Sequence, residues 1–185
     1  MRSLPNFLTF MRVLVVPIFV VLMLEPTPIK NIWAAGIFIG ASVTDWLDGY
    51  LARLYKVESK LGSLLDPLAD KILVTAALVM LASTPCGSRI PGWVVVVILS
   101  REFFVSGLRS IAAVNGIVVK ASRWAKHKTA WLMVAIPGLL IDEPYVILGC
   151  LIDFHKSGII YLTIALFFTV FTGIAYAIEL RKVIV

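Results

Sequence analysis

The sequence is short of charged residues and of cysteine. Charged side chains make up 15% of the 185 residues, whereas hydrophobic ones make up 60%. Such a composition is far more apolar than that of a soluble domain, and it predicts a polytopic membrane protein. The two cysteines, Cys86 and Cys150, lie far apart and belong to no Cys-x-x-Cys or Cys/His pattern. The sequence therefore suggests neither a zinc site nor a redox motif.

The chain also lacks a basic patch with interleaved aromatic residues, although its formal net charge is +6. In a membrane protein, an excess of positive charge usually reports orientation and contact with anionic lipid. We therefore expect the membrane as a partner and no nucleic acid.

Long apolar runs divide the chain into six expected transmembrane helices. The first run ends at Leu24; because Arg12 interrupts it and no small-residue cleavage site follows, it is read as an uncleaved helix. The other five are expected at residues 32–51, 63–82, 92–114, 129–141 and 158–179. Pro144 ends or kinks the fifth helix, so this helix stops at residue 141 or reaches residue 152. We expect one all-α membrane domain over residues 1–185.

The basic residues of the loops predict the orientation of this domain. Ten fall on one side of the expected membrane and three on the other, which places both termini in the cytoplasm. The ten are Arg2, Arg53, Lys56, Lys60, Lys120, Arg123, Lys126, Lys128, Arg181 and Lys182, and the three are Lys30, Arg89 and Lys156. A cation inside a span needs a partner or a water-filled cavity, and four lie within or at the edge of spans: Arg12, Lys71, Arg101 and Arg109. We expect the six helices to surround a polar cleft open to the cytoplasmic side.

The fourth expected helix carries a polar stripe. Glu102, Ser106 and Arg109 recur at i, i+4 and i+7, so they share one face of a helix and predict a buried polar surface. Arg101 and Glu102 are neighbours in the sequence, and we do not expect them to face each other.

Four aspartates stand at the ends of two apolar segments. Asp45 and Asp48 lie on one helical stripe at i, i+3, and Asp66 and Asp70 lie on one stripe at i, i+4. Four carboxylates brought together beside lipid cannot all stay charged without partners. Divalent cations neutralise them, and two ions about 3.5–4 Å apart suit phosphate chemistry.

The complete pattern from Asp45 to Asp70 reads D-x₂-D-G-x₂-A-R-x₈-G-x₃-D-x₃-D. It resembles the signature of the CDP-alcohol phosphatidyltransferase family without a departure. The resemblance implies two Mg²⁺ or Mn²⁺ ions, both bridged by Asp45 and Asp66, with Asp48 binding one of them. It also implies that Asp70 binds the other ion and accepts the proton of the attacking hydroxyl group. The plainer alternative is helix capping, which the spacing Ser63-x-x-Asp66 suggests for one of the acids.

Further residues are expected to bind the donor of this family, CDP-diacylglycerol. They are Asn6, Thr9, Arg12, Gly49, Ala52, Arg53 and Ser59. The first three resemble the N-x-x-T-x-x-R that precedes the signature, and the last matches a position that lines the nucleotide. Small side chains at Gly49 and Ala52 would let a flat base or ribose approach the helix, and the guanidinium of Arg53 suits a pyrophosphate. Interfacial anchoring, helix packing and membrane topology are the respective alternatives for Asn6 to Arg12, for the two small residues and for Arg53.

The acceptor is indicated by basic residues. The stretch Arg101-Glu-Phe-Phe-Val-Ser-Gly-Leu-Arg109 resembles the corresponding segment of phosphatidylglycerophosphate synthases within the family. This implies transfer of a phosphatidyl group to sn-glycerol 3-phosphate with release of CMP, in a homodimer of the bacterial inner membrane. Arg109, Lys126 and Lys128 are the expected acceptor-binding residues, although topology and headgroup binding also account for the two lysines. Inositol phosphate, serine and phosphatidylglycerol remain alternative acceptors.

A divalent-cation transporter is a second hypothesis, because aspartates inside a membrane also mark ion pathways. A transport site should lie near the midplane, with helix breaks in paired repeats. The acids of this chain stand at helix ends on one side, beside Arg53. The pattern therefore favours the enzyme, and a purely structural protein would leave the four acids unexplained.

Overall fold

The computed structural model is built from six helices and one small hairpin. It describes residues 4–55, 60–84, 88–114, 123–147 and 149–184, with the backbone alone at 4–13, 45–55, 60–70, 112–114, 123, 125, 147 and 179–184. The helices are α1 (Leu4–Leu24), α2 (Pro28–Tyr55), α3 (Lys60–Ala82), α4 (Gly92–Val114), α5 (Arg123–Ile141) and α6 (Phe154–Ile184). Each predicted span coincides with one of them, so the largely helical character of the chain is confirmed.

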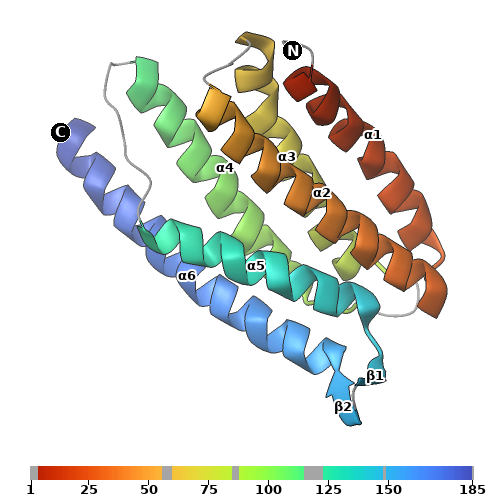
Figure 1. The fold of residues 1–185 in the computed structure, drawn as a ribbon. Helices are drawn as coiled ribbons and strands as arrows, with labels where there is room; N and C mark the ends of the chain where they lie inside the picture. The colour runs from red at the N-terminus through yellow and green to blue at the C-terminus, as the bar shows by residue number, and fades with distance from the viewer. Residues whose placement is uncertain (1–3, 56–59, 85–87, 115–122, 148, 185) are drawn as a thin grey trace.

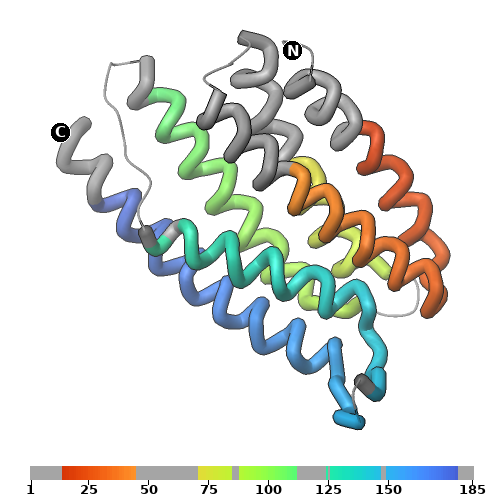
Figure 2. The backbone as a smooth tube through the Cα atoms, viewed as in Figure 1, coloured from red at the N-terminus to blue at the C-terminus, as the bar shows by residue number. Residues whose placement is uncertain are grey.

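The helices form an up-and-down bundle in which α5 packs along α6, and α1 packs against both α2 and α3 (Figure 1). Figure 2 traces the same path as a tube and shows that successive helices run in opposite directions. The bundle consequently has two ends. We call the motif end the one where α1, α3 and α5 begin and α2, α4 and α6 end, and the hairpin end the opposite one.

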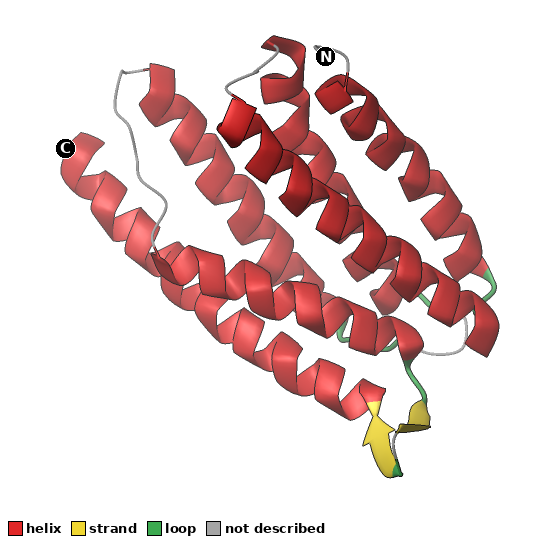
Figure 3. Cartoon of the chain, in the orientation of Figure 1, coloured by secondary structure: helices red, strands yellow, loops and turns green. Residues whose placement is uncertain are grey.

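A hairpin follows α5 and was not predicted from the sequence. Its strands are β1 (Pro144–Ile147) and β2 (Cys150–Asp153), antiparallel with Tyr145 opposite Ile152 (Figure 3). The fifth helix therefore ends at Ile141, the shorter of the two alternatives. Asp142 adopts a left-handed φ of 63° directly after the helix, and Pro144 cannot donate the hydrogen bond that a continuing helix needs.

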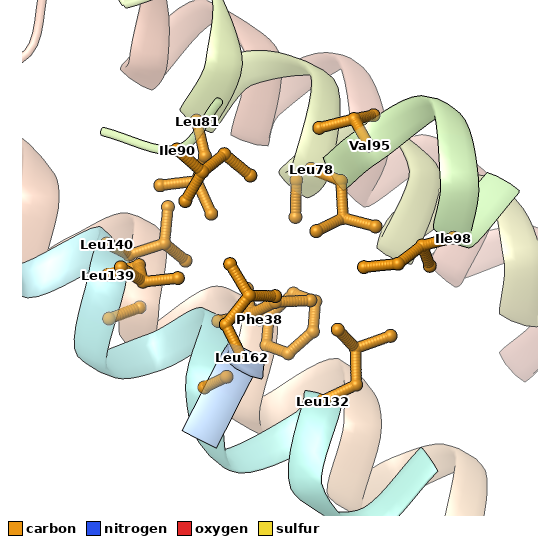
Figure 4. Close-up of a cluster of buried hydrophobic side chains, with 14 of the residues drawn as sticks. Phe38, Leu78, Leu81, Ile90, Val95, Ile98, Leu132, Leu139, Leu140 and Leu162 are labelled. Carbon is orange, nitrogen blue, oxygen red and sulfur yellow. The ribbon is translucent and has the colours of Figure 1, made fainter. Parts of the chain in front are cut away.

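The hydrophobic core lies between the helices near the hairpin end and draws on all six of those described. Figure 4 shows apolar side chains converging from different helices. Its labelled members are Phe38, Leu78, Leu81, Ile90, Val95, Ile98, Leu132, Leu139, Leu140 and Leu162, all of them buried. Each of these side chains makes van der Waals contacts with residues of other helices, so this cluster contributes to the stability of the bundle.

Two glycines let α5 and α6 approach each other. A Cβ atom built on Gly158 would lie 2.8 Å from Cγ and 2.9 Å from the backbone nitrogen of Leu139. One built on Gly138 would lie 3.1 Å from the carbonyl oxygen of Phe154. The contact between these helices therefore needs the absence of a side chain at Gly158.

Arg89 closes the hairpin end. Its side chain is 7% exposed, and its Nε atom donates to Oδ2 of Asp142 at 2.9 Å. Its Nη1 atom donates to the carbonyl oxygens of Leu139 and Leu140, at 3.2 and 2.8 Å, in the last turn of α5, where helical partners are missing. Nδ1 of His155 lies 2.6 Å from the other oxygen of Asp142. A residue counted above as a loop charge is thus buried in an ion pair that ends a helix.

Among the described residues, one helical segment is long and apolar enough to cross a membrane by itself, Phe154–Ile178. Leu14–Leu24 and Lys71–Ala82 are shorter apolar segments of the same kind. Six membrane spans and a cleft open to the cytoplasm accordingly remain predictions.

Candidate functional site

The four aspartates lie at matching levels of two consecutive helices. Asp45 stands ten residues before the end of α2 and Asp70 ten residues after the start of α3, so each lies about 15 Å from that helix end. Asp48 and Asp66 stand seven and six residues from the same ends, which corresponds to about 10 Å. Each of the two levels therefore receives one aspartate from each helix.

The helices that carry these acids are joined directly at the motif end. Residues 56–59 alone connect α2 to α3, so the end of α2 and the start of α3 lie within about 17 Å of each other, and α1 packs against both helices. Figure 1 shows α2 ending and α3 beginning at this end. Oxygen ligands from two consecutive helices at two shared levels are a donor set that Mg²⁺ and Mn²⁺ prefer. The residues present fit a divalent-metal centre.

The side chains of the motif itself lie outside those that the structure describes. Among the described side chains, no group of three or more His, Cys, Asp or Glu residues could hold a metal ion. The ligand roles of Asp45, Asp48, Asp66 and Asp70, and the role of Asp70 as base, therefore stay predictions.

The expected donor-binding residues belong to the same end of the bundle. Asn6, Thr9 and Arg12 lie in the first half of α1, the helix that packs on both α2 and α3. Gly49, Ala52 and Arg53 lie in the last two turns of α2. Ser59 lies outside the described residues. Six of the seven positions thus lie either on α2 itself or on α1, which packs against both helices that carry the aspartates. Their contacts with a nucleotide stay predictions.

A small cavity lies beside the motif, between α3, α4 and α5. Its volume is about 50 Å³, enough for a few water molecules. Lys71, the residue that follows Asp70, lies in its wall. Its polar lining consists of Lys71, Thr75, Glu102, Lys128 and Thr129. A cavity with charged walls therefore begins one residue away from the predicted base.

Glu102 supplies the negative charge of this cavity and is paired with two cations. Its Oε1 atom lies 2.9 Å from Nη1 of Arg101 and also accepts from Nζ of Lys128. The Lys128 side chain is only 5% exposed, and a buried ammonium needs an opposite charge at hand. The prediction that Arg101 and Glu102 would not face each other is wrong, because the long arginine side chain bends along the helix surface to its neighbour.

Two hydroxyl groups extend these contacts to the flanking helices. Ser106 accepts a hydrogen bond from Nζ of Lys71 on α3 and donates to the carbonyl oxygen of Glu102 at 2.7 Å. On the other side, Nη2 of Arg101 donates to Oγ1 of Thr172 on α6 at 2.7 Å. We call these six residues, Lys71, Arg101, Glu102, Ser106, Lys128 and Thr172, the Glu102 network. It joins α3, α4, α5 and α6 at one level.

Arg109 follows the same stripe toward the motif end. Its Nη2 atom donates to the hydroxyl oxygen of Tyr176 on α6 at 2.6 Å, and its Cζ atom lies 5.3 Å from the centre of that ring. Tyr176 is 2% exposed. Among the described residues, no carboxylate pairs with Arg109, and its buried Nε has no hydrogen-bond partner. A guanidinium held by a neutral ring keeps its charge available for an anion.

The contact between Lys71 and Ser106 sets the height of Arg109 relative to the acids. The helices α3 and α4 run in opposite directions (Figure 1), and each residue adds about 1.5 Å. Arg109 stands three residues beyond Ser106 toward the motif end, whereas Asp66 stands five residues before Lys71. Arg109 therefore lies between the levels of Asp66 and Asp70.

The structure separates the two lysines of the expected acceptor set. Lys126 is exposed, whereas Lys128 is buried and engaged by Glu102. Residues two apart point to different sides of a helix, and both belong to α5, where the sequence analysis had expected a loop. Arg109 and Lys126 do not line the cavity that contains Lys128. Acceptor binding by these three residues stays a prediction.

The sequence does not reveal the partners that hold the basic residues. It shows Lys71 as a cation at the edge of a span, and it gives no sign that Thr172 and Tyr176 would bind arginines. One signal was available for Lys71 and Glu102, since opposite charges in apolar segments are expected to find a partner. The sequence does not show which helices face each other, because partners such as Arg109 and Tyr176 are 67 residues apart.

Residues 2–173 match the model of the CDP-alcohol phosphatidyltransferase family. This stretch covers most of the chain and contains the complete aspartate motif and the Glu102 network. The protein belongs to this family, whose members are generally dependent on divalent metal ions and act in biosynthesis at bacterial membranes.

Three similar proteins share one name. A CDP-diacylglycerol–glycerol-3-phosphate 3-phosphatidyltransferase of Bacillus subtilis (strain 168) is 40% identical, with 95% of this chain and 94% of the relative aligned. Proteins of the same name from Rickettsia typhi and Rickettsia bellii are each 37% identical. They align with 95% and 98% of this chain, and 96% and 97% of each relative is covered. The likeness therefore extends over essentially whole proteins.

Proposed function

We propose that the protein transfers the phosphatidyl group of CDP-diacylglycerol to sn-glycerol 3-phosphate, giving phosphatidylglycerophosphate and CMP. Full-length relatives named for this reaction support the proposal. The structural observation that carries the choice of acceptor is Arg109. Its guanidinium has no carboxylate partner among the described residues and stands between the levels of Asp66 and Asp70, where an anionic acceptor must meet the donor.

The reaction joins the acceptor oxygen to phosphorus and breaks the bond between that phosphorus and CMP. Asp45, Asp48 and Asp66 would hold two ions, Mg²⁺ or Mn²⁺, which supply charge stabilisation to the pyrophosphate oxygens when bound. Asp70 would accept the proton of the attacking hydroxyl group, at a distance of about 3 Å. Arg53, near the end of α2, would bind a phosphate through its planar fork. CMP leaves with the electron pair of the broken bond.

The two substrates would use different parts of the motif end. Asn6, Thr9, Arg12, Gly49, Ala52 and Ser59 are proposed to line the nucleotide together with Arg53. Arg109 is proposed to bind the phosphate of the acceptor, with Lys126 and Lys128 as the other members of the basic set. The pairing of Lys128 with Glu102 leaves Arg109 as the partly buried member of the set that has no carboxylate partner among the described residues.

The membrane arrangement is part of the proposal. We infer a single domain over residues 1–185 with six spans in the bacterial inner membrane, a cytoplasmic cleft and both termini in the cytoplasm. The up-and-down bundle supports it, because the start of α1, the end of α6 and the motif lie at the same end (Figure 1). Most of the described loop cations belong to that end. A homodimer is likewise proposed by resemblance to the family, and the mass of the protein in detergent tests it.

An acceptor panel tests the function. Purified protein is given CDP-diacylglycerol and Mg²⁺ or Mn²⁺ with glycerol 3-phosphate, inositol phosphate, serine or phosphatidylglycerol, and CMP and the lipid product are measured. We expect CMP release to be greatest with glycerol 3-phosphate and to exceed that with serine, which carries no phosphate for Arg109, by at least about tenfold, since a charge-assisted contact discriminates on this scale. Preference for another acceptor would overturn the assignment, and no CMP release with any would overturn the enzyme class.

A further inference from the structure

We propose that Glu102 and Ser106 are positioning residues for this reaction, because the Glu102 network fixes the height and rotation of α3 and thereby the place of Asp70. This inference rests on the proposed function. Neither residue is proposed to touch a substrate. They act through Lys71, the residue next to the predicted base.

The need for such a device follows from the packing of α3. This helix packs mainly on α1 and touches α4 and α5 less, and at the level of Lys71 the cavity separates it from them. Between helices in a membrane there is little hydrophobic driving force, so packing and hydrogen bonds determine how they sit. Among the described side chains at this level, the hydrogen bond from Lys71 to Ser106 joins α3 to α4 across the cavity.

The network is suited to holding a helix in place. Ser106 is itself fixed by its bond to the carbonyl oxygen of Glu102 at 2.7 Å. The carboxylate of Glu102 then joins this point to Lys128 on α5, and Arg101 joins it to Thr172 on α6. Lys71 therefore binds α4 directly and is connected through Ser106, Glu102 and Arg101 to α5 and α6. Because Lys71 and Asp70 are adjacent on one rigid helix, a rotation of α3 that moved Asp70 would have to break the hydrogen bond from Lys71 to Ser106.

The first test is Ser106→Ala, with Ser110→Ala as the matched control. Ser110 lies one turn further along α4, is exposed, and donates only to the carbonyl oxygen of Ser106 within its own helix. We expect Ser106→Ala to lower kcat about three- to tenfold, the effect of losing one interhelical hydrogen bond at a reacting geometry. KM for CDP-diacylglycerol should stay within about twofold, and Ser110→Ala should match the wild type.

A second measurement does not depend on activity. Hydrogen exchange of metal-free protein reports the protection of the amides of residues 71–82, and we expect it to fall in Ser106→Ala and not in Ser110→Ala. Exchange in α1 should be unchanged, because its contacts lie on the other side of α3. Equal protection of residues 71–82 in both variants would overturn the inference, whatever the activity shows.

Glu102→Gln extends the test to the centre of the network. Glutamine keeps the size and one acceptor oxygen but removes the charge that Lys128 and Arg101 share, so we expect a larger fall in kcat than in Ser106→Ala. If both variants lose donor affinity and thermal stability in proportion to kcat, the network is merely structural and the inference fails. If wild-type protein releases no CMP, the proposed function fails, and the exchange experiment still decides whether Ser106 holds α3.

Discussion

At the hairpin end, the buried cation Arg89 is paired with an aspartate; toward the motif end, the cations among the described side chains outnumber the acids that hold them. Arg89 shares an ion pair with Asp142 and donates to two carbonyl oxygens of α5. Glu102, in contrast, is shared by Arg101 and Lys128, while Arg109 is held by the neutral Tyr176. The hairpin end thus satisfies its charge internally, whereas the motif end keeps positive charge available.

This difference separates stability from function. A set of partners within the protein holds the end of α5 in one arrangement, since Nε and Nη1 of Arg89 bind Asp142 and two carbonyl oxygens. Uncompensated charge beside a cavity is costly unless an anion or water balances it. We therefore expect substitutions at the hairpin end to change unfolding and substitutions at the motif end to change catalysis.

The largest effect is expected for Asp45→Asn. Removing one carboxylate from the shared level should lower CMP release by more than about 10³-fold, because several kcal/mol of charge stabilisation at the phosphate are lost. The variant should unfold at the same denaturant midpoint as the wild type in detergent. Near-normal turnover would show that the four acids form no metal centre.

Asp70→Asn should separate proton transfer from donor binding. We expect a loss of turnover of about 10²–10⁴-fold, the usual contribution of a general base, with nucleotide affinity largely kept. Both quantities are measured in one detergent at saturating metal. If Asp70→Asn loses CDP-diacylglycerol as completely as Asp45→Asn does, Asp70 acts mainly as a ligand.

Arg89→Met tests the hairpin end. The substitution leaves Oδ2 of Asp142 and two carbonyl oxygens without their donor, and we expect the free energy of unfolding to fall by about 2–4 kcal/mol. KM for both substrates should not change at temperatures where the variant is folded. Lys30→Met is the matched control, because Lys30 pairs with exposed Glu25 at 3.5 Å and such a pair contributes less than about 1 kcal/mol. An Arg89→Met variant that unfolds like Lys30→Met would contradict the comparison.

Arg109→Ala probes the charge left available at the motif end. We expect KM for glycerol 3-phosphate to rise about 10- to 100-fold, the value of a charge-assisted hydrogen bond. KM for CDP-diacylglycerol should stay within about twofold. Initial rates with one substrate varied at a time give both constants. An equal change in both would assign Arg109 to the structure of the bundle.

The smallest effects come from two glycines near the hairpin end. Gly158→Ala puts a methyl group against the backbone of Leu139 and should destabilise by about 1–2 kcal/mol through overpacking. Gly36→Ala, also in a helix, meets no atom within 4 Å and should stabilise by about 0.5–1 kcal/mol. Denaturant midpoints in detergent measure both. Equal shifts would mean that α5 and α6 do not pack as closely as described.

Much of the fold could be predicted from the sequence, and some could not. The apolar runs located all six helices, because a span must be apolar along its length. They did not reveal the hairpin at Pro144–Asp153, where Tyr145 to Ile152 is apolar enough to suggest a longer helix. Only the left-handed turn at Asp142 and the missing donor of Pro144 end α5 at Ile141.

The site divides in the same way. The sequence by itself determined the four acids and their family, because the motif is local and its residues fall on stripes fixed by the helical period. Tertiary structure decided which cation is neutralised and which is available. Lys128, expected in a loop, is buried and paired with Glu102, whereas Arg109 donates a hydrogen bond to Tyr176 of α6. Partners so far apart along the chain are chosen by helix packing, which depends on the shapes of all the helices together and which no local pattern records.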